Sequence, residues 1–526
     1  MRPLLLLALL MPALATAQTP GTCARGAATA RLNAGDVDAT LYNGGNLFQG
    51  PTASSQYVVP RVSGGTALYA AGLWVGATVG GEPRVASASF EADFWPGPLN
   101  AGAALPNPAN CSAYDRIYVV TAAEVAAYEA GAAPAADLAA WPVGLGAEAR
   151  NAAGRLVVPT SRGQIINLAS GERPVVLGGQ TAFWVMNDVG YAHTRSGSAP
   201  LGIEVQVTAS AFVSGPTALR QSTAYRFRIV NRNTVALDSA FVSFFVDTNI
   251  GTDIPNQRQG VDLPRGMAFT YNRNPTATPY GISPAVGYDF LNTGVGAHRY
   301  ALNGSAAGTS DPSTTQGIYN TMRGLWNDGT PQLAFGSGYG QTQGAVTRYA
   351  FPADPVTAQF WSGENTNGQG GTALGGNSRS IASTPGFRLA PGASADVAIA
   401  VLFAQGADRL DSVTRLRAAS DLVQAAYDAG TLLPTAADVP PTSVGMAELG
   451  EPVPNPARGT LAVDVSMPVA GRLRIVDVLG RTVAEQPLSA GTQTVRLDTQ
   501  RLAPGAYALV LDAGTARATR TVTVVR

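Results

Sequence analysis

Short runs of alternating apolar and polar residues, separated by turn-forming residues, extend along most of this chain. Residues 203–207 and 225–230 place apolar side chains at every second position, which is the repeat of a half-buried β-strand. The chain contains 60 Gly and 36 Pro, whereas charged residues make up 13% and leave little material for long exposed helices. The pattern predicts a mainly β protein with a large, sandwich-like, β-rich body.

Two segments carry a helical pattern instead. Residues 121–130 are rich in Ala and begin with the capping-box pair Thr121 and Glu124, which predicts a short helix. Residues 408–429 end before Gly430 and predict a longer amphipathic helix. Its apolar positions at helical spacing are Leu410, Val413, Leu416, Ala419, Leu422, Val423 and Ala426.

Residues 1–17 have the pattern of a signal peptide. Arg2 supplies a positive start, residues 4–10 are almost all Leu, and Ala15 and Ala17 form a small-x-small cleavage pattern. We therefore expect the mature chain to begin at Gln18. No apolar stretch reaches the roughly 20 residues that span a bilayer without charge, Gly or Pro, so no transmembrane anchor is expected.

The rest of the chain divides at residues 434–451, which are rich in Pro and small residues and are expected to form a linker. Upstream, residues 18–433 form the β-rich body, which could comprise two subdomains. Downstream, residues 452–526 alternate apolar and polar positions between Gly-bearing turns. This alternation predicts a small antiparallel sandwich in the tail.

Three short motifs follow one another in this tail. They are Pro454, Asn455 and Pro456; then Asp477, Gly480 and Arg481; then Leu502, Gly505 and Tyr507. In this order they resemble the type A C-terminal sorting domain of proteins that Bacteroidota export by type IX secretion. The resemblance implies an immunoglobulin-like sandwich, contact with the secretion machinery, and export through the periplasm to the cell surface or beyond.

The body contains several Trp, Gly and Asp-rich phrases, at residues 72–76, 93–98, 141–142, 245–251, 284–290 and 322–329. Through these phrases it resembles large exported Bacteroidota proteins that carry the same tail. The resemblance implies a shared architecture and an extracellular address, and it implies no catalytic activity.

The charge pattern excludes several kinds of chemistry. The sequence contains no Lys, so its basic residues are all Arg and no phosphate-loop or Schiff-base lysine exists. The formal net charge is zero, which argues against nucleic acid as a partner.

Cys23 and Cys111 are the only two cysteines. In an exported protein an even number of cysteines favours a disulfide, and closing a loop of this length contributes about 4 kcal/mol. The alternative is a pair of buried free thiols.

The residues that usually carry catalysis are scarce, and we predict no catalytic residue. His193 and His298 are the only histidines, too few for a three-histidine zinc site. Glu91 and Asp93 would share one face of a strand beside aromatic residues, as in a glycosidase cleft. The alternative for this segment is a rigid packed corner.

Oxygen-bearing side chains at Asp247, Asn249 and Asp253, with Asp262 further on, have a spacing that calcium uses. The segment departs from an EF-hand, and the alternative is an Asx-rich turn after a buried strand. Calcium is the only cofactor that the sequence suggests.

Six tryptophans offer a second possible binding feature, a platform that stacks on glycans; the alternative is that they belong to the core. They are Trp74, Trp95, Trp141, Trp184, Trp326 and Trp361. Taken together, the sequence predicts an exported surface or extracellular protein with a structural or binding body. The alternative is a secreted hydrolase that acts on polysaccharide through paired carboxylates.

Overall fold

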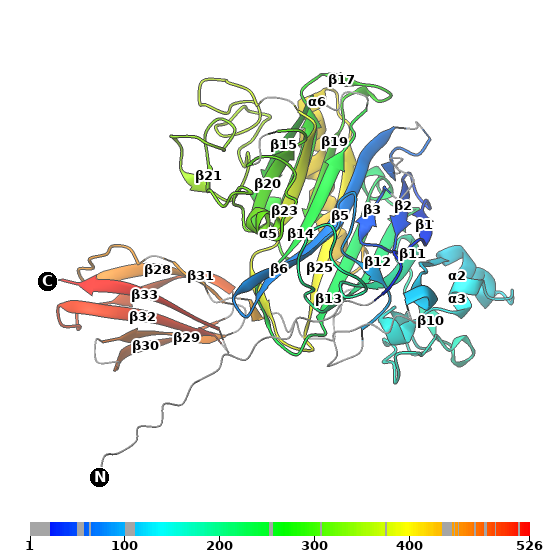
Figure 1. Ribbon diagram of the computed structural model, residues 1–526, viewed down its shortest axis with the longest axis horizontal. Helices are drawn as coiled ribbons and strands as arrows, with labels where there is room; N and C mark the ends of the chain where they lie inside the picture. The colour runs from blue at the N-terminus through cyan, green and yellow to red at the C-terminus, as the bar shows by residue number, and fades with distance from the viewer. Residues whose placement is uncertain are drawn as a thin grey trace, which may run out of the picture.

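The computed structural model describes residues 22–49, 57–62, 65–99, 111–251, 256–305, 308–373, 376–433, 444–445, 448–450, 452–467, 470–477, 481–489, 491–513 and 516–525. Within them the chain is mainly β, as expected, with two large antiparallel sheets in the body and two small sheets in the tail (Figure 1). The predicted signal peptide and most of the predicted linker lie outside the described residues.

The first large sheet is centred on two long strands, β5 (Thr66–Val79) and β14 (Leu237–Thr248), in which Leu73 lies opposite Phe244. Its other strands are β1 (Thr29–Leu32), β2 (Asp38–Tyr42), β3 (Asn46–Leu47), β4 (Tyr57–Val58), β6 (Glu82–Ser87), β20 (Ala297–Leu302), β23 (Ser378–Ser383), β24 (Phe387–Leu389) and β26 (Val444–Gly445). The order is β1-β2-β3-β5-β14-β23-β20, with β4, β6, β24 and β26 attached beside this path.

The second large sheet contains the two alternating runs that the sequence singles out. Its strands are β7 (Trp95–Pro96), β8 (Tyr118–Thr121), β11 (Gly179–Asn187), β12 (Ile203–Phe212), β13 (Thr223–Asn231), β15 (Gln257–Asp262), β16 (Met267–Asn272), β19 (Ala285–Phe290) and β25 (Ser394–Ala404). The order is β15-β16-β19-β25-β13-β12-β11-β7, and β8 pairs with β11. The predicted strands at 203–207 and 225–230 are confirmed as β12 and β13, which pair with each other. They are buried on both faces and not half-buried as predicted, because α6 and its neighbours cover the face that points away from the shared core.

The two large sheets face each other across one apolar core. Phe227 of β13 and Phe244 of β14 lie with ring centroids 6.4 Å apart, and Tyr288 of β19 lies 6.4 Å from Phe244. Apolar side chains of both sheets belong to this single cluster of buried residues. The body is thus built as a sandwich, and burial of such aromatic rings supplies much of its stability.

Both predicted helices are present, α2 (Ala122–Glu129) and α6 (Arg409–Asp428). Thr121 caps α2, because its Oγ1 accepts from the Glu124 backbone N–H (3.2 Å) while Glu124 Oε2 accepts from the Thr121 N–H (2.8 Å). Helix α6 packs on the face of β25 that points away from the shared core. Its buried apolar residues are Val413, Leu416, Ala419 and Val423.

Three further helices are short: α3 (Ala136–Ala139), α4 (Thr217–Arg220) and α5 (Thr315–Met322). Helix α5 covers the outer face of the first sheet, where Ile318 and Met322 pack against Trp74. Gly76 allows this close approach, because a Cβ there would lie 2.7 Å from the Met322 sulfur. The remaining paired segments are β9 (Ala149–Arg150) with β10 (Arg173–Pro174), β17 (Thr276–Ala277) with β18 (Gly281–Ile282), and β21 (Gln332–Leu333) with β22 (Val346–Thr347).

The tail consists of two small sheets around its own core. One contains β27 (Glu448–Leu449), β28 (Thr460–Met467) and β31 (Gly491–Asp498); the other contains β29 (Gly471–Val476), β30 (Thr482–Leu488), β32 (Gly505–Ala513) and β33 (Ala516–Val524). Leu461, Val463, Leu509 and Val522, at alternating positions, share one buried cluster. That the tail is immunoglobulin-like stays a prediction.

Candidate functional site

A pocket of about 800 Å³ opens where four segments of the body meet. These segments are residues 23–26, 42–49, 90–95 and 191–194. The side chains that define its character are Arg25, Gln49, Phe90, Glu91, Tyr191 and Thr194. We call this site the aromatic pocket. Its volume lies within the range of small-molecule sites in proteins.

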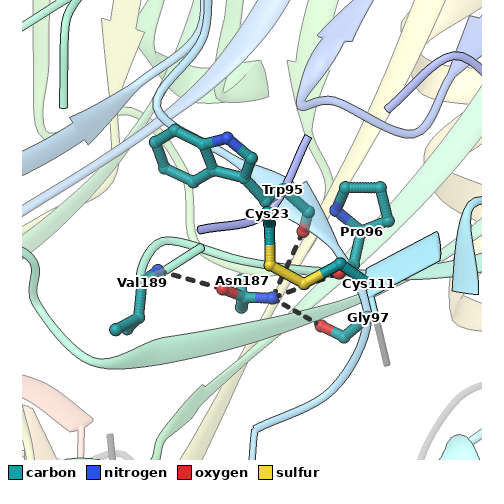
Figure 2. The surroundings of a disulfide bond; sticks show 7 residues. All are labelled: Cys23, Trp95, Pro96, Gly97, Cys111, Asn187 and Val189. Carbon is teal, nitrogen blue, oxygen red and sulfur yellow. Dashed lines mark hydrogen bonds between the residues drawn. A yellow bond between two sulfur atoms is a disulfide. The ribbon is translucent and has the colours of Figure 1, made fainter. Parts of the chain in front are cut away.

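One wall of the pocket is fastened by a disulfide bond. Cys23 and Cys111 are bonded, with their Cα atoms 5.7 Å apart, and both lie buried against Trp95 (Figure 2). Asn187 holds the neighbouring chain, because its Nδ2 donates to the Gly97 carbonyl (2.9 Å) and its Oδ1 accepts from the Val189 N–H (3.0 Å). The predicted disulfide is therefore present, and it supports one side of the pocket.

Arg25 joins three of the four segments. Its guanidinium donates to the Ala92 carbonyl and, from Nη2, to Thr194 Oγ1 (2.8 Å). It also lies over the ring of Trp95, 5.9 Å from the ring centroid. These contacts hold the 90–95 and 191–194 segments in fixed positions around the N-terminal segment.

Asp115 fixes the same N-terminal segment from the other side. Its Oδ1 accepts from the backbone N–H groups of Ala27 (2.9 Å) and Ala28 (2.8 Å) and from Asn43 Nδ2 (2.8 Å). The carboxylate thus connects the segment around Cys111 to two strand-bearing segments. With the disulfide, it makes the frame of the pocket rigid before any ligand is present.

The aromatic rings that solvent reaches in the pocket are not tryptophans. Tyr191 is 49% exposed and Phe90 is 37% exposed, while Trp95 is 1% exposed. Tyr191 leans against Trp95 with ring centroids 6.5 Å apart, and Phe90 stands edge-on to Phe245 at 5.6 Å. All six tryptophans are buried, so the core interpretation is confirmed for them and a tryptophan platform is not present.

Two amide side chains line the pocket and form hydrogen bonds within the protein. Gln49 Nε2 donates to the Tyr69 hydroxyl (3.2 Å), while Gln49 Oε1 has no donor among the described residues. Asn46 Nδ2 donates to the Gln49 carbonyl (2.7 Å). Sequence patterns do not indicate Gln49, Arg25 or Tyr191, because they come from distant segments that only the folded chain brings together.

Glu91 and Asp93 do not form the predicted carboxylate pair. Ala88 and Ala92 form an antiparallel bridge, so residues 88–92 fold back as a tight corner and strand alternation does not apply. Asp93 is fully buried and accepts from the N–H groups of Ser87 (3.2 Å) and Arg195 (2.9 Å). Glu91, by contrast, is exposed in the pocket. Because the segment is folded back and Asp93 is buried, the packed-corner alternative describes it.

Both histidines are buried and hydrogen-bonded within the fold. The His193 ring nitrogens lie 2.9 Å from the Val85 carbonyl and 2.6 Å from the Asp188 carbonyl. His298 lies 3.0 Å from the Ala350 carbonyl, and burial lowers its pKa to about 4. His298 is therefore neutral near pH 7. Both histidines serve as internal hydrogen-bonding residues of the fold.

The candidate calcium ligands are divided among different partners. Asp247, at the end of β14, lies 3.4 Å from Arg379, and burial raises its pKa to about 7. Asp262 pairs with Arg417 (3.0 Å), and Asp253 lies outside the described residues. No cluster of three or more His, Cys, Asp or Glu residues suited to a metal occurs in the described part of the chain. The calcium site with Asn249 stays a prediction.

A second, larger groove of about 1080 Å³ lies beside strands β12 and β13. Two carboxylates line it, Glu148 and Glu172. Glu148 pairs with Arg226 (2.5 Å), and Glu172 accepts from the Asn167 N–H (2.8 Å). Both carboxylates therefore already have partners within the protein.

The motif residues of the tail close its turns and bind its last strand. The Asn455 side chain donates to the Thr521 carbonyl (3.1 Å) and accepts from the Thr523 N–H (2.9 Å), both on β33. Asp477 and Arg481 form an ion pair (2.8 Å) across the turn between β29 and β30. Gly480 lies outside the described residues.

The third motif follows the same principle. The Tyr507 hydroxyl donates to the Ala503 carbonyl (2.7 Å), and the Leu502 N–H donates to the Thr499 carbonyl (3.0 Å). Gly505 begins β32 opposite Val524 of β33. The described motif residues thus stabilise turns and the last strand of the tail.

Residues 453–525 match a protein-family model described as "Secretion system C-terminal sorting domain". The tail is a secretion sorting domain. The sorting domain confirms the predicted type IX secretion tail of Bacteroidota-type exported proteins, and it directs the protein to the cell surface or the extracellular space. Within the described residues, no helix is long and apolar enough to cross a membrane.

No curated protein matches this chain. Among solved structures, a polysaccharide lyase is similar at 8% identity with a TM-score of 0.19, over 61% of this chain and 34% of that chain. The BSP domain of a biofilm-associated protein is similar at 10% identity with a TM-score of 0.13, over 66% of this chain and 59% of that one. This chain therefore spans about a third of the lyase, and TM-scores this low assign neither fold nor activity.

Proposed function

We propose that this is an exported binding protein whose body holds a ligand in the aromatic pocket and performs no reaction on it. The observation that carries the proposal is the composition of that pocket. It combines two half-exposed aromatic rings, Phe90 and Tyr191, with planar polar groups on a disulfide-fastened frame. Among its described lining residues Glu91 is the only carboxylate. A pocket of this kind can bind and orient a ligand, and it lacks the paired groups of an acid–base catalyst.

The proposal assigns a separate role to each part of the chain. Residues 18–433 form the binding body, 434–451 the linker, and 452–526 the sorting domain, after removal of residues 1–17. A separate apolar core, formed by residues of the sorting domain together with Leu449 at the end of the linker, supports this division. The body and the sorting domain would then fold as independent units.

A polysaccharide hydrolase is the second candidate, and the larger groove is the observation that favours it. Glycoside hydrolysis uses two carboxyl groups about 5–10 Å apart, and Glu148 and Glu172 both line that groove. The ion pair between Glu148 and Arg226 weighs against a free catalytic acid there. Turnover of a polysaccharide that is abolished by Glu148→Gln would establish this second candidate.

A thermal-shift panel tests the binding proposal. The mature chain is melted with neutral sugars, charged sugars, amino acids and quaternary ammonium compounds, because a ligand that binds only the folded state raises the Tm. We expect at least one compound to stabilise the wild type and not Tyr191→Ala. Phe360→Ala is the matched control, since Phe360 is also 49% exposed and lies outside the pocket. Stabilisation by no compound, or equal stabilisation of both proteins, would overturn the proposal.

A further inference from the structure

We infer that the aromatic pocket binds a neutral saccharide; this inference rests on the binding function proposed above. The first reason is the pair of exposed rings. A pyranose has an apolar C–H face, and the exposed parts of the Tyr191 and Phe90 rings offer apolar surface to it, beside the Arg379 guanidinium, which lies 5.4 Å from the Phe90 ring centroid. Both rings are also held in place by other aromatic side chains, Trp95 and Phe245, so little entropy is lost when a sugar stacks on them.

The second reason is the set of polar groups between the rings. Sugar hydroxyls both donate and accept hydrogen bonds, so they need neighbours of both kinds. Arg25 supplies donors, Glu91 supplies acceptors, and the exposed hydroxyl of Thr194 can offer both. Such a set suits a ligand that carries several hydroxyl groups on one ring.

The third reason is the charge balance, which decides between a sugar and charged ligands. Arg25 and Glu91 are the only charged side chains among the described lining residues, and their charges cancel. A quaternary ammonium group would favour the aromatic rings, but the guanidinium of Arg25 already occupies the neighbourhood of Trp95 at 5.9 Å. An anion would meet the carboxylate of Glu91. A neutral ligand avoids both repulsions.

The experiment measures binding of defined sugars to the mature full-length chain by calorimetry. The probes are neutral gluco-, manno- and galacto-oligosaccharides, with a uronic-acid oligosaccharide, choline and free amino acids as comparisons. We expect a neutral oligosaccharide to bind, and Tyr191→Ala to weaken it about tenfold or more through the lost stacking. Phe360→Ala should leave the affinity unchanged. Glu91→Gln should weaken binding, because the charged acceptor is replaced by a neutral one. The affinity of the wild type should depend little on salt, because no ligand charge is involved.

The outcomes separate this inference from the proposed function. Binding of only charged sugars, choline or amino acids, lost in Tyr191→Ala, would overturn the saccharide inference and leave the binding function standing. Binding of a neutral sugar that survives both Tyr191→Ala and Phe90→Ala would overturn the assignment to this pocket. Binding of no probe in any class would overturn both. Melting curves of each variant without ligand show whether it folds, and Glu91→Gln, at an exposed position, provides a variant that leaves the packing intact.

Discussion

Removing the disulfide should destabilise the body by a predictable amount. Cys23 and Cys111 are 88 residues apart, and the chain-entropy model gives about 4.6 kcal/mol for closing a loop of that length at 25 °C. For a body of about 416 residues that unfolds cooperatively, this corresponds to a fall in Tm of roughly 5 °C. Both cysteines are buried, so Cys23→Ala with Cys111→Ala is preferable to serine, which would bury an unpaired hydroxyl.

The assay compares three forms of the mature chain by calorimetry: oxidised wild type, reduced wild type and the double alanine variant. Reduced wild type and the variant should melt together, below the oxidised form. Ligand binding in the aromatic pocket should weaken in both, because the wall that holds Trp95 is released. A variant that melts within about 1 °C of the oxidised wild type would refute the loop-closure argument. Two alkylatable thiols in the unreduced protein would refute the bond itself.

Four further predictions follow from the structure. Burial raises the pKa of Asp289 from 3.8 to about 7. The protonated side chain therefore stabilises the fold fully below pH 4, and this stabilisation is lost as the pH rises through 7. Asp289→Asn should make the Tm of the protein depend less on pH between pH 4 and 8. Asp115→Ala should cost about 2–4 kcal/mol in a denaturant titration, because three donors lose their acceptor, whereas Asp115→Asn should cost less. If Asp247 and its neighbours hold calcium, chelation should lower the Tm and metal analysis should find the ion; an unchanged Tm returns this segment to an Asx-rich turn. Deleting residues 452–526 should leave a folded body in the periplasm, with Gln18 at its N-terminus by sequencing; export of the truncated chain would contradict this.

The strands and helices were predictable because short, local sequence patterns determine them. Residues 203–207 of β12 and 225–229 of β13 alternate apolar and polar positions, and the caps of α2 and α6 lie within three residues of the groups they bind. For the two helices, the residues that determine their ends are near one another in sequence. The sorting domain was predictable because its three motifs follow one another in the order typical of that family, although Asn455 binds Thr521 and Thr523 on the distant strand β33.

The aromatic pocket was not predictable, because its parts are distant in sequence. Arg25 and Thr194 are 169 residues apart and meet through a side-chain hydrogen bond. Of the two alternatives for Glu91 and Asp93, the glycosidase-like pair assumed an extended strand, whereas the bridge between Ala88 and Ala92 folds the segment into the packed corner. The six tryptophans are conspicuous in the sequence, but all of them are buried and cannot form a binding surface. Tyr191 is exposed in the pocket, and no sequence motif around it indicates this.

If the expected signal peptide leads the chain N-terminus first into the periplasm, the position of the disulfide sets the order in which parts of the chain arrive there. Both of its cysteines lie in the first part of the chain, and the sorting domain lies at residues 453–525. Disulfides form in the oxidising periplasm and not in the cytosol, so a chain that crosses the inner membrane N-terminus first delivers both sulfur atoms before its tail. The frame of the pocket can therefore be locked covalently while the sorting domain is still on the other side. The sorting domain, which directs the last step of export, would then reach the periplasm after the disulfide of the aromatic pocket has formed.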